Sequence, residues 1–170
     1  MSREKLPVTP GIRFLKKTGV TYSDHLYTYE EYGGTAVSAR ELRVDEHTVV
    51  KTLVMEDDRK KPLIVLMHGD RQVSTKELAR RIGVRTIAPC SPDTAEKHTG
   101  YKVGGTSPFG TRKQVPVYME ETILDLEKIY INAGHRGYLV GIDPRDLLSL
   151  LNLTLVRVAV PAEPKHQLSR

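Results

Sequence analysis

The sequence predicts a mixed α/β fold in which a central mixed, largely antiparallel sheet is flanked by short helices. Short apolar, β-branched runs recur along the 170 residues and alternate with segments that carry helix-start signals. Two such runs, at 48–55 and 62–67, are separated only by the charged turn 56–61 and therefore predict an antiparallel hairpin. A doubly wound parallel sheet would instead need a long crossover between its strands.

Helix boundaries follow from the capping residues. Thr9 followed by proline marks a first helix, which Gly19 ends. Ser74 and Glu77 form a capping box for a helix that stops at Gly83. The same signals predict the remaining helices at 35–42, 92–99 and 143–151, and one helical turn at 122–127.

The remaining apolar runs are predicted to be strands, and they complete one sheet. These strands are expected at 21–29, 115–119, 128–132, 137–142 and 153–160. We expect a single domain over 1–160 and a flexible C-terminal tail over 161–170.

The composition is that of an ordinary globular protein, with 39% hydrophobic and 28% charged residues. Cys90 is the single cysteine, which excludes an intramolecular disulfide and favours a reducing compartment. The N-terminus has no apolar leader and no stretch is long and apolar enough to span a membrane, so the sequence predicts a cytoplasmic protein. The net charge of +5 favours polyanions such as RNA, although it also suits plain solubility.

The stretch 100–110 holds four glycines, one proline, three side-chain hydroxyls and a lysine. Glycine lets a ligand approach main-chain N–H groups, so such a loop can present several donors to one anionic or carbonyl oxygen. It lacks the Gly-Lys-Ser/Thr ending of a phosphate-binding loop and the dinucleotide fingerprint. The alternative is a long surface connection.

Lys51 lies within a strand that otherwise suits burial. Strand alternation places Lys51 on one face with Val49 and Leu53, and Thr52 on the opposite face with Val50 and Val54. A lysine among apolar neighbours must reach solvent, pair with an acid or line a cavity. The functional reading is a positive charge in a cleft that binds a phosphate, a carboxylate or a developing oxyanion.

Other reactive residues give weaker signals. Cys90 precedes a predicted helix, whose N-terminus can lower a thiol pKa, but a lone buried cysteine is the simpler reading. The six histidines are dispersed without metal-binding spacing. Asp143 and Asp146 suit helix capping. Several tyrosines offer either cross-sheet packing or stacking on the bases of a single-stranded RNA end. These are Tyr22, Tyr27, Tyr29 and Tyr32.

Four motifs occur in a fixed order along the chain: Val50-Lys51-Thr52-Leu53, the helix 76–80, Gly104-Gly105-x-Ser107-Pro108-x-Gly110 and the segment 129–137. Together they resemble the YbaK/EbsC proteins, the stand-alone relatives of the editing domain inserted in bacterial prolyl-tRNA synthetases. The resemblance runs from about residue 9 to residue 160, and the spacing is most similar to the Cys-tRNA(Pro) deacylases.

This resemblance implies an active cleft between the lysine strand and the glycine loop, without cofactor or metal. In the family the loop backbone holds the aminoacyl carbonyl, and the lysine contacts the substrate at its 3′-terminal adenosine. Carried onto this chain, the catalytic residues are Lys51 and Gly105. The substrate-binding residues are Tyr22, Thr52, Gly104, Thr106, Ser107, Gly110, Asp143 and Asp146. The segment 28–35 is shorter here than in the family, so its edge of the pocket differs.

The function that the resemblance implies is trans-editing deacylation of mischarged Cys-tRNA(Pro). An aminoacyl ester is already activated, so its hydrolysis needs placement and oxyanion stabilisation more than a protein nucleophile. In the family reading, the substrate thiol attacks its own ester and releases a thiolactone. The alternatives are deacylation of Ala- or Ser-tRNA, or a non-catalytic module that binds tRNA or an aminoacyl adenylate. The expected partners are the aminoacylated tRNA 3′ end and prolyl-tRNA synthetase, with no membrane.

Overall fold

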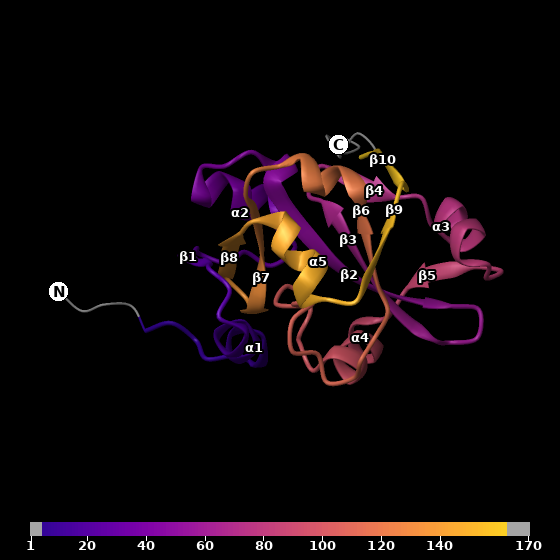
Figure 1. The fold of residues 1–170 in the computed structure, drawn as a ribbon, viewed down its shortest axis with the longest axis horizontal. Coiled ribbons are helices and arrows are strands. Elements are labelled where there is room, and N and C mark those ends of the chain that lie inside the picture. The colour runs from indigo at the N-terminus through magenta and orange to yellow at the C-terminus, as the bar shows by residue number, and fades with distance from the viewer. Residues whose placement is uncertain (1–4, 163–170) are drawn as a thin grey trace, which may run out of the picture.

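A computed structural model describes residues 5–162, which fold around an eight-stranded sheet (Figure 1). The strands lie in the order β1-β8-β7-β2-β3-β6-β9, and β5 pairs with β2 beside this path. The strands of this sheet are β1 (Ser23–Leu26), β2 (Val49–Asp57), β3 (Pro62–His68), β5 (Ile87–Pro89), β6 (Val117–Glu120), β7 (Ile129–His135), β8 (Tyr138–Ile142) and β9 (Leu153–Val156). A second sheet pairs β4 (Arg71–Val73) with β10 (Ala159–Pro161).

The main sheet is mixed, as predicted. Its four antiparallel pairings are β1–β8, β2–β3, β2–β5 and β7–β8, and its three parallel pairings are β2–β7, β3–β6 and β6–β9. The predicted hairpin is confirmed, since β2 and β3 pair continuously from Val50 opposite His68 to Glu56 opposite Pro62.

The helices predicted to start after Thr9 and Ser74 begin and end at their predicted caps, whereas the helix predicted at 143–151 divides into a 3-10 turn and a four-residue α-helix. The Thr9 and Ser74 hydroxyls accept hydrogen bonds from the N–H groups of Ile12 and Glu77, and Gly19 and Gly83 end their helices with left-handed φ angles of 74° and 77°. The α-helices are α1 (Pro10–Thr18), α2 (Gly34–Leu42), α3 (Thr75–Ile82), α4 (Pro92–Thr99) and α5 (Leu147–Leu150). Short 3-10 turns are η1 (Glu46–Thr48), η2 (Glu121–Asp125) and η3 (Pro144–Asp146). Within residues 5–162, no helix combines the length and apolarity that a membrane span requires.

Two strand predictions were wrong in extent. The strand expected at 21–29 covers only Ser23–Leu26, because its partner β8 begins at Tyr138, opposite Leu26. The strand expected at 153–160 divides into β9 and β10, which belong to different sheets. Between them, the N–H groups of Val158 and Ala159 both donate to the buried Glu120 carboxylate at 2.7 Å.

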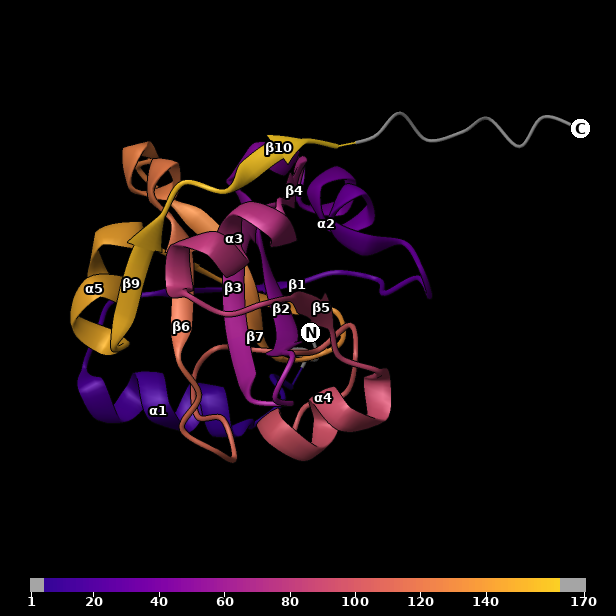
Figure 2. The same ribbon diagram turned by 90° about the vertical axis from the view of Figure 1, so that its right-hand side faces the viewer.

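The predicted tail at 161–170 falls mostly outside the described residues. Its first residue, Pro161, still belongs to β10, opposite Arg71 of β4. Figure 2 shows this short β10–β4 ribbon above α3.

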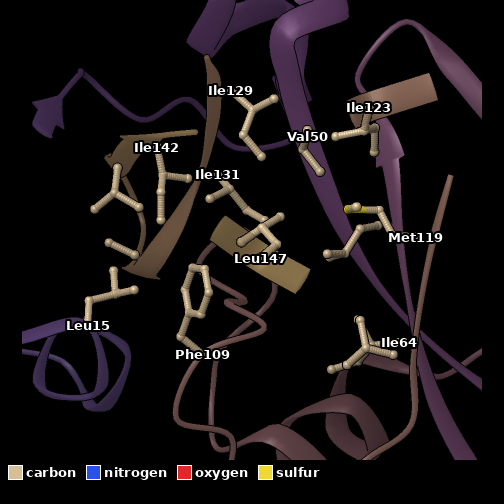
Figure 3. Packing of buried hydrophobic residues seen from close by; sticks show 14 of the residues in the cluster. Leu15, Val50, Ile64, Phe109, Met119, Ile123, Ile129, Ile131, Ile142 and Leu147 are labelled. Atoms are coloured by element: carbon tan, nitrogen blue, oxygen red, sulfur yellow. The ribbon is translucent and has the colours of Figure 1, made fainter. Parts of the chain in front are cut away.

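Helices cover both faces of the main sheet. On one face, α1, α4 and α5 contribute Leu15, Ala95 and Leu147 to the largest hydrophobic cluster. Figure 3 shows Phe109, from the glycine-rich loop, lying between Leu15 and Leu147 in this cluster. The opposite face carries two smaller clusters, one beneath α3 and one beneath α2. The core therefore anchors one end of the loop through Phe109.

Candidate active site

The main sheet opens along one edge of β2. There, β7 pairs with β2 only at Val49 and Val50, and β5 pairs with it only from Met55 onward. Val54 O points to this edge, because it accepts a hydrogen bond of 3.0 Å from Cys90 N. By strand alternation, the N–H and C=O groups of Thr52 point to the same edge. Residues 51–54 therefore border a break in the sheet, which we call the sheet opening.

Thr52 contributes a side chain as well as backbone groups to the sheet opening. Among residues 5–162, its hydroxyl is the one buried side-chain polar atom that has no hydrogen-bond partner. Leaving a buried hydroxyl unpaired costs about 1–3 kcal/mol of folding free energy. A ligand that reached this hydroxyl would therefore break no existing hydrogen bond.

Lys51 lies on the opposite face of β2, as the strand pattern predicted. Val50 and Val54 belong to the largest cluster, whereas Val49 and Leu53 belong to the two clusters on the other face. The Lys51 ammonium is half-buried and donates to Arg71 O. Burial lowers the pKa of Lys51, and the charges of Glu46 and Asp70 partly oppose that shift. The lysine is thus a constrained cation rather than a solvated one.

A histidine–aspartate pair supports the turn that holds Lys51. His47 Nδ1 lies 2.8 Å from Asp70 Oδ1, and Asp70 precedes the residue whose carbonyl binds Lys51. The pKa of Asp70 is lowered even though burial acts to raise it, because His47 hydrogen-bonds the carboxylate and Arg71 lies nearby. Sequence reasoning missed this pair, since nothing in the spacing of residues 47 and 70 signals contact.

His68 packs beneath this pair. Its ring stacks on His47 at 3.8 Å between centroids, with an angle of only 6° between the ring planes. Both His68 ring nitrogens are engaged, Nδ1 with His47 O and Nε2 with Thr122 Oγ1, each at 2.8 Å. Because a histidine binds metal in the plane of its ring, two parallel stacked rings do not present their nitrogens to one ion. The three residues, which lie close enough to suggest a metal site, are better explained as a hydrogen-bonded support.

The glycine-rich loop is fixed to the β7–β8 hairpin. Asn132 Nδ2 donates to Gly104 O at 3.0 Å, and Arg136 Nε donates to Val103 O at 2.9 Å. Asn132 directly follows Ile131, which pairs with Val50, so it stands level with Lys51 on the neighbouring strand. The loop is therefore tied to the sheet at the point where the sheet opening begins.

Within the loop, residues 102–105 form a turn. Gly105 N donates to Lys102 O at 2.9 Å, and Gly104 takes a φ of 89° at the third position, which defines a type II turn. The Gly105 N–H is therefore used within the turn, and the catalytic assignment of Gly105 stays a prediction that this hydrogen bond does not favour. The flanking N–H groups of Gly104 and Thr106 make no hydrogen bond within the described residues.

Gly105 has a steric role instead. A β-carbon at this position would lie 2.9 Å from Arg136 N and 3.0 Å from the His135 carbonyl carbon. Both contacts are with backbone, which cannot rotate away. Gly105 therefore lets the loop lie directly against the hairpin.

Two further loop residues hold the fold rather than face a ligand. Ser107 is fully buried, and its hydroxyl accepts a hydrogen bond of 3.1 Å from Phe109 N. Gly110 has a φ of 64°, and a β-carbon there would lie 2.5 Å from Pro10 O. Their assignment to substrate binding stays a prediction that the contacts do not favour.

The remaining candidates lie away from the loop. Asp143 follows β8, at the end of that strand opposite the turn at Arg136. Its carboxylate caps η3 and pairs with Arg145 at 2.9 Å. Asp146 precedes α5. Tyr22 lies beside the edge strand β1, and burial and the charge of Asp24 raise its pKa. The structure therefore brings Lys51, Thr52, Gly104, Gly105 and Thr106 to one region, and it places these three residues elsewhere.

Cys90 is not an activated nucleophile. Burial, together with the charge and hydrogen bond of Glu56, raises its pKa to about 11. The thiol precedes the N-cap of α4, Ser91.

Comparison with known proteins identifies the family. Residues 30–150 match the sequence profile of the aminoacyl-tRNA editing domain. The chain belongs to the aminoacyl-tRNA editing domain family. It is thereby an enzyme of the aminoacyl-tRNA deacylase class, as the sequence motifs predicted.

Individual relatives agree with this family. The editing domain is 30% identical over 145 residues to EbsC of Enterococcus faecalis (strain ATCC 700802 / V583), a candidate Cys-tRNA(Pro)/Cys-tRNA(Cys) deacylase, and the match covers 85% of this chain and 88% of that protein. It is 24% identical over 105 residues to a proline–tRNA ligase of Limosilactobacillus fermentum, covering 59% of this chain but only 18% of the ligase.

Solved structures share the fold. The hypothetical protein APE2540 matches with a TM-score of 0.82 at 22% identity, covering 89% of this chain and all of that one. A candidate trans-editing enzyme for prolyl-tRNA synthetase matches with a TM-score of 0.76 at 19% identity, covering 91% of this chain and 99% of that one. The predicted fold is thus confirmed.

Proposed function

We propose that this editing domain removes cysteine from mischarged Cys-tRNA(Pro) in trans. The observation that carries the proposal is the sheet opening, which is bordered by Lys51 and Thr52 on the two faces of β2 and to which Asn132 ties the glycine turn. The Thr52 hydroxyl and the N–H groups of Gly104 and Thr106 have no acceptor within residues 5–162, whereas Lys51 donates to Arg71 O. An ester carbonyl and a ribose hydroxyl are acceptors that suit such donors. The similarity to EbsC supports cysteine as the amino acid.

In this proposal each of these side chains and N–H groups has a defined role. The Lys51 ammonium binds the 3′ end of the tRNA and offsets the negative charge that develops during ester cleavage. The N–H groups of Gly104 and Thr106 donate to the ester carbonyl oxygen as it becomes an oxyanion. The Thr52 hydroxyl orients the ester between them.

The substrate supplies the nucleophile. The cysteinyl sulfur attacks the ester carbonyl carbon, a carbon–sulfur bond forms, and the bond from that carbon to the ribose 3′ oxygen breaks. The thiol proton ends on the ribose hydroxyl, and the amino acid leaves as a cyclic thiolactone. This route needs no protein nucleophile, which agrees with the raised pKa of Cys90.

A second candidate substrate is Ala- or Ser-tRNA, with water as the nucleophile. The relationship to proline–tRNA ligases favours tRNA(Pro) as the carrier in either case. We further propose that prolyl-tRNA synthetase supplies tRNA selectivity as a partner, and that both act in the cytoplasm.

Deacylation of labelled Cys-, Ala- and Ser-tRNA(Pro), with and without prolyl-tRNA synthetase, tests these proposals. Lys51→Ala is expected to abolish turnover of Cys-tRNA(Pro), whereas Lys76→Ala, an exposed residue on α3, is the matched control and keeps it. Recovery of thiolactone supports attack by the substrate thiol, and recovery of free cysteine contradicts it. Faster turnover of Ala-tRNA(Pro) would overturn the substrate assignment.

A further inference from the structure

A strained tyrosine stands at the tip of a turn between β1 and α2. Gly33 N donates to Glu30 O at 3.0 Å, and Tyr32 takes a φ of 61° at the third position. This is a type II turn, in which the third position favours glycine because a β-carbon is strained there. The chain has glycine at the next two positions but tyrosine at this one.

Packing does not compensate for this strain. Tyr32 is 97% exposed, more than any other large apolar or aromatic side chain in the described part of the protein. Residues 5–162 contain two other non-glycine residues with positive φ, Arg43 and Lys60, and both are solvated basic side chains in ordinary helix-end and hairpin positions. Backbone strain that the fold itself does not compensate is characteristic of functional positions.

The residue that leads into the turn lies against the glycine-rich loop. Tyr29 precedes it, and the Tyr29 hydroxyl oxygen is 2.5 Å from where a β-carbon on Gly104 would be. The Arg136 guanidinium lies 5.1 Å from the centroid of the Tyr29 ring and also holds the loop through Val103 O. Tyr29 thus joins the turn to the candidate active site, and Tyr32 follows three residues further along the chain.

Two basic side chains accompany the contact between Tyr29 and the loop, whereas the turn itself carries Glu30 and Glu31, of which Glu30 pairs with Arg40 at 2.8 Å. Lys102 and Arg136 are both exposed, one in the loop and the other in the hairpin beneath it. Basic side chains neutralise phosphates without reading sequence, and an exposed aromatic ring stacks on any nucleobase. An exposed aromatic ring near a loop that carries basic groups suits a single-stranded nucleic acid.

We propose that Tyr32 is a stacking platform for a nucleobase of the unpaired 3′ end of an RNA. The ring holds the strand while its terminal ester enters the sheet opening. This inference rests on the proposed function, since it takes the substrate to be an aminoacyl-tRNA. It adds Tyr32 as an RNA-binding residue that is separate from the groups proposed to act on the ester.

The test uses a short RNA hairpin with an unpaired 3′ end, in which 2-aminopurine replaces one of the last three bases in turn. Binding to the full-length protein is expected to quench one of these positions. Tyr32→Phe keeps both quenching and affinity, whereas Tyr32→Gly loses the quenching and weakens binding about fivefold or more. Tyr32→Gly also suits the left-handed turn, so its Tm is expected to equal or exceed that of the parent protein. Leu148→Ala, an exposed apolar side chain on α5, is the control and leaves binding unchanged.

Deacylation kinetics with the same variants separate this inference from the proposed function. Tyr32→Gly is expected to raise KM with kcat retained, and Lys51→Ala to lose kcat while quenching persists. Wild-type quenching and KM in Tyr32→Gly would overturn the stacking platform and leave the proposed function intact. Deacylation absent from the parent protein, with Tyr32-dependent quenching present, would instead overturn the proposed function alone.

Discussion

Replacing Gly105 by alanine should damage catalysis through contact alone. Its φ is outside the left-handed region, so the backbone conformation itself tolerates alanine. The new β-carbon would lie 2.9 Å from Arg136 N, about 0.5 Å inside the 3.4 Å at which ordinary contact begins. Since the obstacle is the backbone of a β-hairpin, the loop must move rather than the hairpin.

The size of the effect follows from that displacement. Overpacking of this kind costs about 1–3 kcal/mol of stability. A shift of about 1 Å in a catalytic group costs about a hundredfold in rate, so half that shift is expected to lower kcat about tenfold. The Gly104 and Thr106 N–H groups move with Gly105, and KM should change less than kcat.

The matched control is Gly83→Ala at the end of α3. Gly83 has a φ of 77° and open space around its missing β-carbon, so alanine there costs about 1–2 kcal/mol through backbone strain only. Urea unfolding and single-turnover deacylation of both variants at the same temperature give the comparison. If Gly105→Ala loses as much stability as Gly83→Ala but retains wild-type kcat, the loop does not position the reacting ester.

Three other changes test the remaining groups. Thr52→Val removes the unpaired buried hydroxyl and should raise the free energy of unfolding by about 1 kcal/mol while lowering kcat/KM, and a drop in stability would show that the hydroxyl is bonded. Asp70→Asn removes a charge that raises the pKa of Lys51, so the alkaline limb of the pH profile of kcat/KM should move to lower pH. If that limb does not move, its pKa does not belong to Lys51. Because the pKa of Cys90 is about 11, iodoacetamide should react on the order of a hundredfold slower than with a free thiol at pH 8, and Glu56→Gln should speed the reaction; Cys90→Ser should keep full deacylation.

Local signals in the sequence predicted the helices and the hairpin. A cap such as Ser74 or a helix-ending Gly83 acts within a few residues, so its effect is readable from the sequence alone. The division of 153–160 into two strands was not readable. It depends on Glu120, whose carboxylate binds two N–H groups 38 and 39 residues away.

The same distinction explains the candidate site. Lys51 and the glycine loop were found because their residue types are unusual for a strand and a connection. The His47–Asp70 pair and the sheet opening arise from tertiary contacts and from strand partners that end, and neither leaves a mark on the local sequence. For Gly105, the sequence predicts a catalytic role that the hydrogen bond within the turn does not favour, and that bond was not readable because it depends on φ angles that glycine leaves undetermined.

The sheet opening also allows the binding of a substrate mimic to be measured without following ester cleavage. A central strand normally protects its amides from hydrogen–deuterium exchange, since both neighbours bind it. In β2, the Thr52 amide faces an edge without a strand partner, although Val50 and Val54 on either side are held. That single amide should exchange fast in the free protein and slowly once a substrate mimic fills the edge. The exchange rate of the Thr52 amide would then report whether the proposed ester-binding site is filled.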